Sequence, residues 1–584
     1  MKRNNRNILN FKDTAKKLLI LLVVFLCVDH LSFAQETTFD KHGGQLVFTA
    51  TSDPRSFNPI IAKESSSSGV VGYLFEGLTK IDGITLEVLP SLAKSWEISR
   101  DGLTWIFHLR DDVLWSDGVP FSADDVVFTF NDLIYNDAIP SSARDIFTID
   151  GKIFKVEKVD AHTVKFVLPI RFAPFLRSMA TGIMPKHALK SSVDDRTFNF
   201  KWGIDTPVSE IVGTGPYLLE LYQPGQRIIL RANPLYWEKS DQGERLPFID
   251  RIVFLIVQNQ DVSLLKFLEG ETDSCRVRGT DYALLKPLEK EKNFTVYDLG
   301  SESGNSFIVF NQNPRLNPKT GKPFVDPVKL SWFQNLEFRK AVAHVIDKKR
   351  IVEITMNNLG YPQYGTMNPN SGLFYNPNVI KYEYDLKKAK QILNSAGFID
   401  RDGDGILEDK EGNVVEFNFF TNSNGAERIQ IASIVRHDLE ELGMRVNFLV
   451  LEFNNLVAKL IANYEWDAIL IGLTGGIEPH FGKNVWVSDG QLHFWNPGQE
   501  KPATKWEARI DEIFSAAVQE LDDKKRKPLY DEWQMIVSQE LPVIYTVLGA
   551  GVSAVRNKFG NLKPSLHGGV FHNLEEIYVK EEYR

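Results

Sequence analysis

Regularly spaced carboxylates mark the segment 400–411 as a candidate cation site. The segment reads Asp-Arg-Asp-Gly-Asp-Gly-Ile-Leu-Glu-Asp-Lys-Glu. Aspartates at alternate positions converge on a hard cation, glycine at the sixth position permits a sharp turn, and an acid at the twelfth can close the site with two oxygens. The spacing predicts a calcium loop with these ligands: Asp400, Asp402, Asp404, the backbone carbonyl of Ile406, Glu408 and Glu411.

The elements around this loop differ from those of an EF-hand. A helical pattern over 385–396 precedes it, but the residues that follow, 414–420, alternate between apolar and polar as a strand does. We therefore expect a lone loop between a helix and a strand. A structural role is favoured over a sensing one, because calcium is abundant outside cells and fills weak sites there. The alternative is an acidic turn that glycines shape and that holds no ion.

Residues that commonly carry catalysis show no catalytic arrangement in the sequence. It contains no zinc-binding His-Glu-x-x-His, no phosphate-binding loop and no Gly-x-Ser-x-Gly elbow. The segment 213–216, Gly-Thr-Gly-Pro, is best interpreted as a turn before a strand, and Cys275 as a half-buried thiol. His480 and His493 share one aromatic-rich loop, where solvated or stacking histidines are favoured over a metal pair. We expect no enzymatic activity and no required cofactor, calcium aside.

The N-terminal segment has the pattern of a secretory signal peptide. Its first part is rich in Lys and Arg, and the apolar run 18–28 that follows is about half as long as the ~20 residues of a membrane-spanning helix. Small residues at Ser32 and Ala34 predict cleavage after Ala34, which makes 1–34 the signal peptide and the location periplasmic. Lipid attachment at Cys27 is less favoured, because Leu26 precedes it inside the apolar run.

The composition is that of a large globular protein. The chain has 584 residues, 43% of them hydrophobic and 11% aromatic, which corresponds to about three or four domain-sized units. Its formal net charge of −9 argues against a nucleic-acid partner and against docking on anionic lipid. After cleavage only Cys275 is left, so an intramolecular disulfide is excluded.

Hydrophobic periodicity predicts a mixed α/β chain. Strand patterns occupy 45–50, 104–109, 163–168, 227–231 and 251–256. Helix patterns occupy 123–135, 334–351, 385–396, 428–442 and 522–539, with Ser122 and Asp385 as predicted N-caps and Gly397 as a stop signal. Strands dominate up to about residue 300, and helices alternate with strands after it.

The segment 93–118 closely resembles the signature of the extracellular solute-binding proteins that serve peptide and nickel importers. More segments of this family resemblance follow in the same order along the chain: 121–126, 184–187, 212–217, 231–237, 246–250, 338–347, 384–393 and 466–472. The resemblance extends from about residue 45 to the C-terminus.

This resemblance implies an α/β, two-lobed periplasmic-binding-protein fold of type II, in its large peptide-binding class. The first lobe would combine 35–80, 205–301 and 546–584, with an inserted subdomain at 81–204. The second lobe would be 302–545 and would contain the calcium loop. The chain would cross between lobes near 301–310 and near 545, with 300–304 as a glycine-flanked hinge segment. Hinge closure would then trap a ligand between the lobes.

The resemblance also implies a function: a monomeric substrate-binding component of an ABC importer that captures a peptide or similar small solute and delivers it to the membrane permease. A non-peptide solute in the same fold, such as an oligosaccharide, a metal chelate or an amphiphile, is the alternative. The implied ligand-binding residues are Phe57, Asn58, Asn311, Gly472, Leu473, Thr474 and Gly475, and we add Glu478 and Trp495 as candidates from the segment that follows.

One departure from the family pattern concerns the ligand. Peptide-binding members commonly carry an Asp that pairs with the ammonium terminus of the peptide, and here Gly476 stands at that position while Leu473 replaces an aromatic residue. Glu478 is the nearest acid that would substitute. The loop 479–496 that follows is aromatic and polar, and it is predicted either to form a wall that stacks on the ligand or to pack on its own rings.

Overall fold

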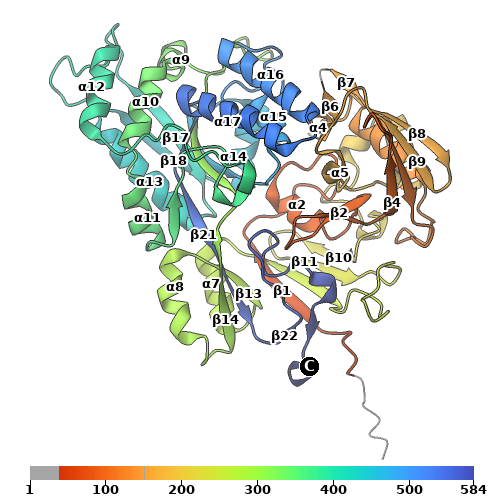
Figure 1. Cartoon of the computed structure of the whole chain (residues 1–584). Helices are drawn as coiled ribbons and strands as arrows, with labels where there is room; N and C mark the ends of the chain where they lie inside the picture. Colours follow the sequence, from red (N-terminus) through yellow and green to blue (C-terminus); the bar gives the residue numbers. More distant parts are fainter. Residues whose placement is uncertain (1–38, 142, 150) are drawn as a thin grey trace, which may run out of the picture. The chain divides into compact units, whose positions relative to one another are not determined.

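The structure is a computed structural model that describes residues 39–584 except 142 and 150 (Figure 1). Contacts divide the chain into two units, 1–41 and 42–584, and everything below concerns the second. The predicted signal peptide, 1–34, and the alternative lipid site Cys27 lie outside the described residues. Within these residues no helix is both long and apolar enough to cross a membrane.

Two sheets are built largely from residues before 301 together with the C-terminal strand. In the first, β1 (Gln45–Ala50) runs parallel to β12 (Arg251–Ile256), and β11 (Arg227–Ala232) and β10 (Tyr217–Gln223) continue it antiparallel. In the second, β21 (Val547–Arg556) lies between β13 (Ser274–Val277) and β14 (Phe294–Ser301), and β16 (Gly360–Pro362) also pairs with it. The helices of this region are α2 (Ser65–Val71), α7 (Gln260–Glu269) and α8 (Gly279–Leu285).

The third sheet is formed by residues between 305 and 545. Its order is β18 (Arg445–Leu451), β17 (Glu416–Asn422), β19 (Ala468–Leu473), β15 (Asn305–Phe310) and β20 (Val543–Tyr545). Phe307 and Val309 of β15 face one hydrophobic cluster and Ile308 and Phe310 face another, because successive side chains of a strand point to opposite faces. Both faces of this sheet are therefore buried.

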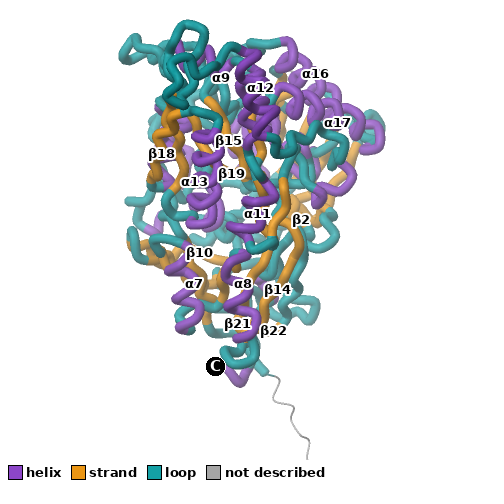
Figure 2. Tube along the Cα trace, turned by 90° about the vertical axis from the view of Figure 1, so that its left-hand side faces the viewer, coloured by secondary structure: helices purple, strands orange, loops and turns teal. Residues whose placement is uncertain are grey.

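Helices cover the third sheet, as Figures 1 and 2 show. One hydrophobic cluster joins the sheet to the helices α9 (Pro327–Gln334), α10 (Leu336–Val345), α11 (Lys348–Met356), α12 (Leu386–Ala396) and α13 (Ala426–Glu441). The other joins it to α14 (Phe453–Ala458), α15 (Lys483–Trp486), α16 (Lys505–Gln519) and α17 (Asp523–Glu540).

A fourth sheet lies within the segment predicted as the inserted subdomain. Its order is β4 (Ala93–Ile98), β5 (Thr104–Leu109), β9 (Thr163–Val167) and β8 (Lys155–Asp160). Around it lie α3 (Ala123–Phe128), continued by a π-helical turn Thr129–Ile134, and α4 (Ala143–Phe147), α5 (Phe175–Ser178) and α6 (Lys186–Asp194). Short pairs complete the fold: β2 (Thr79–Ile81) with β3 (Val88–Pro90), β6 (Thr148–Ile149) with β7 (Lys152–Ile153), and β22 (Phe559–Gly560) with β23 (Tyr578–Val579).

Two neighbouring chain segments connect the second sheet to the third. The first runs from β14 to β15 through 302–304, and the second runs from β20 to β21 through Thr546. The segments are tied together, because the backbone N–H of Thr546 donates to the carbonyl of Ser306 at 2.8 Å. A pair of short connections of this kind suits a hinge. The lobe boundaries inferred from the sequence stay a prediction.

Most predicted elements are confirmed, and one helix is not. The strands predicted at 45–50, 104–109 and 251–256 match β1, β5 and β12 residue for residue. The single helix predicted over 334–351 is wrong, since α10 ends at Val345 and α11 begins at Lys348. Ile346 is extended, and the Asp347 side chain accepts from the N–H of Arg350 at 3.0 Å, which starts a new helix.

Candidate functional site: a strand-end junction and a cation loop

The carboxyl ends of β1 and β17 meet in one place, which we call the strand-end junction (residues 51–53, 422–428 and 472–475, with 302–305). The side-chain amide of Asn424 donates to the carbonyl of Thr51 at 3.0 Å and to the hydroxyl of Ser52 at 2.6 Å. Asn454 donates to the carbonyl of Asp53 at 3.4 Å. In open α/β sheets, ligands bind outside the carboxyl ends of strands, so this is where a solute site is expected.

Three charged side chains, two of them from the junction itself, form a network at this place. An Nη of Arg276, on β13, lies 2.7 Å from a carboxylate oxygen of Glu302 in the first connecting segment. The other Nη lies 4.0 Å from Glu427 in the first turn of α13. The side chain of Arg276 is 43% exposed and that of Glu302 34% exposed, so both meet solvent. Burial raises the pKa of Glu427, and the positive charge of Arg276 acts in the opposite direction.

Arg428 completes this charge group, and it has no carboxylate partner. Among the described residues no Asp or Glu lies within ion-pairing distance of its guanidinium, which donates instead to the side-chain oxygen of Asn422 at 2.8 Å. Burial, and then the positive charge of Arg276, lower the pKa of Arg428. A half-buried guanidinium without a carboxylate partner favours binding of an anionic ligand group, because it can bind a carboxylate with two parallel hydrogen bonds.

The predicted segment Gly472-Leu473-Thr474-Gly475 lies at the junction. A Cβ added to Gly472 would lie 2.7 Å from the carbonyl oxygen of Asn305 and 3.0 Å from Arg428. A Cβ at Gly475 would overlap the carbonyl of Ser303 at 1.3 Å. Glycine is thus required at both positions for the close approach of β19 to the connecting segment. Gly476 is exposed and has nothing within 4 Å of such a Cβ.

Glu478, the acid expected to replace the family's ligand-anchoring Asp, is already paired in this structure. Its two oxygens accept from the two Nη atoms of Arg526 at 2.5 and 3.1 Å, and one of them also accepts from the N–H of His480. The side chains of Glu478 and Arg526 are only 7% and 3% exposed. We therefore correct the expectation and assign Glu478 to an internal ion pair.

Four other predicted ligand residues are buried inside the protein. The ring of Phe57 packs on Tyr222, and the indole N–H of Trp495 donates to Glu507. The side chain of Asn58 forms hydrogen bonds with the backbone of residues 60 and 201, and that of Asn311 donates to the backbone carbonyls of residues 464 and 466. Each is at most 1% exposed. Their polar groups are satisfied within the protein, so the structure gives them a framework role in place of ligand contact.

The loop 479–496 packs on its own rings and on the inserted segment. Trp486, Phe494 and Trp495 belong to the hydrophobic cluster under α16 and α17. The ring of His480 lies 3.2 Å from the carbonyl of Ile146, and Lys483 donates to the carbonyl of Thr148. Burial lowers the pKa of His480 to about 3, so the ring is neutral at this contact. The loop links two parts of the fold and forms no stacking wall.

His493 and Cys275 also have structural surroundings. The ring of His493 contacts the carbonyl of Val485 at 3.1 Å and the carboxylate of Glu507 at 3.4 Å, while His480 faces other residues. The two histidines therefore do not act as a metal pair in this arrangement. Cys275 is 3% exposed, and burial raises the pKa of its thiol to about 11, which suits a packing role.

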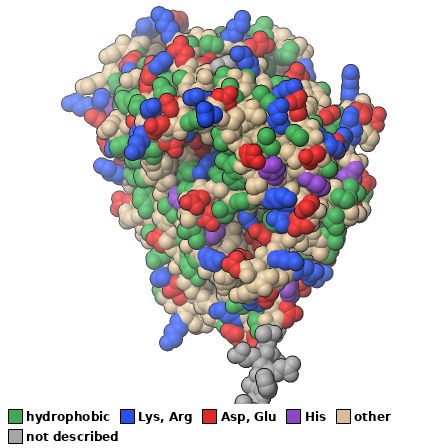
Figure 3. All heavy atoms as spheres, turned by 45° about the vertical axis from the view of Figure 1, so that its right-hand side comes forward, with side chains coloured by type: hydrophobic (Ala, Val, Ile, Leu, Met, Phe, Trp, Pro, Cys, Tyr) green, Lys and Arg blue, Asp and Glu red, His purple; other side chains and the backbone are tan. Residues whose placement is uncertain are grey.

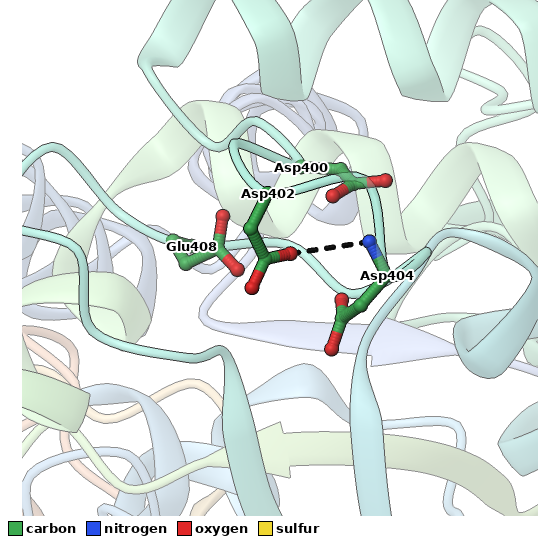
Figure 4. Close-up of side chains that lie close together, drawn as sticks. All are labelled: Asp400, Asp402, Asp404 and Glu408. Atoms are coloured by element: carbon green, nitrogen blue, oxygen red, sulfur yellow. Dashed lines mark hydrogen bonds between the residues drawn. The ribbon is translucent and has the colours of Figure 1, made fainter.

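The acidic loop brings its carboxylates together (Figure 4). Oxygens of Asp400, Asp402, Asp404 and Glu408 all lie within 4.8 Å of one another. Two oxygens on opposite sides of a calcium ion lie about 4.6–5.2 Å apart, since each Ca–O bond is about 2.3–2.6 Å. The donor set therefore fits calcium. Glu411 is outside this group, so the structure does not bring its carboxylate together with the other predicted ligands.

Local hydrogen bonds explain why the loop takes this form. Asp400 accepts from the N–H groups of Gly403 and Gly405 at 2.8 and 3.0 Å, and Asp404 accepts from the N–H of Ile406 at 2.7 Å. Gly405 has φ of 87°, a conformation that glycine adopts without strain. Glu408 is held by a backbone bridge to Ile399 and is 6% exposed, which fixes the base of the loop.

Comparisons with known proteins agree with this architecture. Residues 87–491 match the family model of the bacterial extracellular solute-binding proteins, family 5 middle. A probable ABC transporter-binding protein of Deinococcus radiodurans is 29% identical, over 86% of this chain and 86% of that protein. The oligopeptide-binding protein AppA of Bacillus subtilis is 26% identical, over 97% of each chain.

Solved structures give the same result. That of AppA from Bacillus subtilis in complex with a nonapeptide has a TM-score of 0.77 and 25% identity, and covers 93% of this chain and 100% of that chain. That of MelB from Agrobacterium fabrum in complex with stachyose has a TM-score of 0.80 at 22% identity, over 93% and 86% of the two chains, which shows the fold. The predicted two-lobed α/β fold of type II is confirmed.

The family model covers well over half of the chain, and its relatives match over nearly their whole length. The function that follows is capture of a solute as the binding component of an ABC importer. This chain belongs to family 5 of the bacterial extracellular solute-binding proteins.

Proposed function

We propose that the ligand is a short peptide with a free carboxyl terminus, held between the lobes at the strand-end junction and passed to the permease. The chain is exported, loses 1–34 by cleavage after Ala34, and works as a monomer that binds its ligand without catalysis. Arg428 carries this proposal, because it is a half-buried cation without a carboxylate partner at the position where a solute is expected.

The charges at the junction favour a peptide over a neutral sugar. Arg276, Glu302, Glu427 and Arg428 provide both signs, which suits a ligand with an ammonium and a carboxylate. Sugar sites rely on aromatic faces, and the aromatic loop that was expected to supply them packs on its own rings and on the inserted segment. Elsewhere acidic and basic side chains are intermixed over the face that Figure 3 shows.

Mass spectrometry of the ligand released from native purified protein tests the proposal. We expect short peptides, recovered in near-stoichiometric amounts after mild acid denaturation. Protein that is unfolded and refolded before the assay controls for adventitious peptides, since it retains none. Reproducible recovery of an oligosaccharide, a metal chelate or an amphiphile would replace the peptide with that class of solute.

We further propose that the loop 400–408 binds calcium as a structural ion. Four carboxylates at this separation repel one another, and a divalent cation removes that repulsion. Because the ion binds only the folded loop, it stabilises the fold by about 2.7 kcal/mol when the free calcium concentration is a hundred times the dissociation constant.

Calorimetric titration of the chelator-treated protein with calcium should give one site with a dissociation constant of about 0.1–1 mM, the range of extracellular modules. Asp402→Asn should abolish this heat, because it removes a charged ligand from the cluster. Asp137→Asn changes an acid whose side chain is 99% exposed and is the matched control. Absence of heat in the unaltered protein, with no change in melting temperature after chelation, contradicts a calcium site.

A further inference from the structure

A pocket that shares no residue with the strand-end junction lies at the start of α11. Its volume is ≈ 630 Å³, which lies within the range of about 300–1,000 Å³ for small-molecule sites. The residues that line it come from the α10–α11 break, from α11, from the segment after β16 and from the segment before α12: Ile346, Asp347, Lys348, Lys349, Arg350, Glu353, Tyr364, Tyr382, Glu383 and Tyr384.

Lys348 is the unusual group in this pocket. The residue is only 5% exposed, and no residue of the described chain accepts a hydrogen bond from its ammonium or lies within ion-pairing distance of it. Its Nζ lies over the ring of Tyr364, 5.0 Å from the centroid. Burial lowers the pKa of Lys348 to about 8, with Glu383 acting in the opposite direction. A buried ammonium without a counter-ion is costly unless a bound anion supplies one.

The other two cations that line the pocket have carboxylate partners. Arg350 pairs with the buried carboxylate of Asp438 at 2.9 Å, and Asp347 caps the N–H of Arg350. Lys349 lies 3.7 Å from Glu383, with its side chain 78% exposed. Among the cations that line the pocket in the described part of the chain, Lys348 is therefore the one without a carboxylate partner.

We propose that this pocket is a second small-molecule site, which binds an aromatic monocarboxylate with its carboxylate on Lys348 and its ring among Tyr364, Tyr382 and Tyr384. The pocket has room for a ring with a short acidic side chain. The three tyrosines supply apolar faces. Glu353 and Glu383 in the same lining disfavour an anion of higher charge, such as a phosphate.

The pocket also lies close to elements that contact the segments connecting the lobes. Figures 1 and 2 both show α11 beside α8, and a Cβ at Gly279, the first residue of α8, would overlap the carbonyl of Met356, the last residue of α11. Gln363, which precedes Tyr364, accepts from the N–H of Ser306 on β15 at 3.1 Å. The second site is therefore outside the strand-end junction but attached to the elements that connect the lobes.

Phenylacetate is the probe for this site, with the neutral 2-phenylacetamide as its matched control. Titration of the purified chain, followed by ligand-observed NMR and calorimetry, should show one phenylacetate bound per chain and at least tenfold weaker binding of the amide. A saturating short peptide, or whichever ligand mass spectrometry identifies, should leave phenylacetate binding unchanged. Displacement of phenylacetate by that ligand would place the probe at the junction and overturn the proposal.

Variants separate the lysine from its surroundings. Lys348→Met should weaken phenylacetate at least tenfold, and Tyr364→Ala should weaken it about three- to tenfold, while Lys390→Met, at an exposed lysine of α12 outside the lining, stays within twofold. Tyr364→Ala keeps the test decisive if Lys348→Met does not fold. The proposal is wrong if the unaltered chain does not bind phenylacetate, or if binding survives both Lys348→Met and Tyr364→Ala.

Discussion

Arg428→Met is expected to weaken peptide binding by about 2–3 kcal/mol, roughly a hundredfold in the dissociation constant. The guanidinium lies at the strand-end junction and is held by Asn422, without a carboxylate of its own. A ligand carboxylate would supply the missing partner, and methionine removes the charge while it keeps most of the apolar stem. Calorimetric titration with the peptide recovered from the native protein measures the change.

Two comparisons make this prediction specific. Arg436→Met alters the same helix at a side chain that is 43% exposed and 3.7 Å from Glu440, and it should leave the affinity unchanged. A peptide with an amidated C-terminus should bind the unaltered protein about a hundredfold more weakly, yet lose little more in Arg428→Met. If Arg428→Met weakens binding of the amidated peptide as much as it weakens binding of the free-acid peptide, Arg428 does not bind the C-terminal carboxylate.

Local signals explain why much of the fold was predictable. Ser122 is followed three residues later by Asp125, and the structure shows the full capping box at the start of α3. Asp385 caps α12, and Gly397 ends it in the left-handed conformation. Alternating strands such as 104–109 bury every second residue. Each of these features depends on neighbours a few residues apart, so the sequence displays it directly.

The break between α10 and α11 shows where prediction from local periodicity fails. The apolar spacing continues from one helix into the next, so periodicity predicts a single helix over 334–351. Asp347 gives the restart signal, but an Asp within a helical pattern is also a common exposed residue. The outcome depends on a hydrogen bond of its side chain to the N–H of Arg350. This break also places Lys348 at the buried start of α11.

The site was less predictable than the fold, because its charges come from distant segments. Arg276, Glu302 and Arg428 belong to three separate elements that only the assembled sheets bring together. The sequence offered partial signals: Glu302 lies in the glycine-flanked segment 300–304, and Arg428 opens a predicted helix just after a predicted strand. By contrast, the nearest acid in sequence, Glu478, is neutralised by Arg526 from α17, a partner that spacing does not reveal.

Arg526→Met is expected to lower the free energy of unfolding by about 3–5 kcal/mol, because it leaves the Glu478 carboxylate buried without its counter-ion. The guanidinium makes two bonds to Glu478, donates to the carbonyl of Ala517 at 3.1 Å, and lies over the rings of Phe374 and Tyr530. Urea unfolding followed by intrinsic fluorescence measures the loss.

Arg509→Met is the matched control. The side chain of Arg509, on α16, also forms ion pairs but is 44% exposed, so this substitution should lower the free energy of unfolding by less than about 1 kcal/mol. The double variant Glu478→Gln/Arg526→Met should recover part of the lost free energy of unfolding, because the amide at position 478 is uncharged and needs no counter-ion. If Glu478 instead anchors the ligand, Glu478→Gln alone would weaken peptide binding at least tenfold while stability stays unchanged. The internal pair predicts the reverse: a large effect on unfolding and little direct effect on affinity in variants that remain folded.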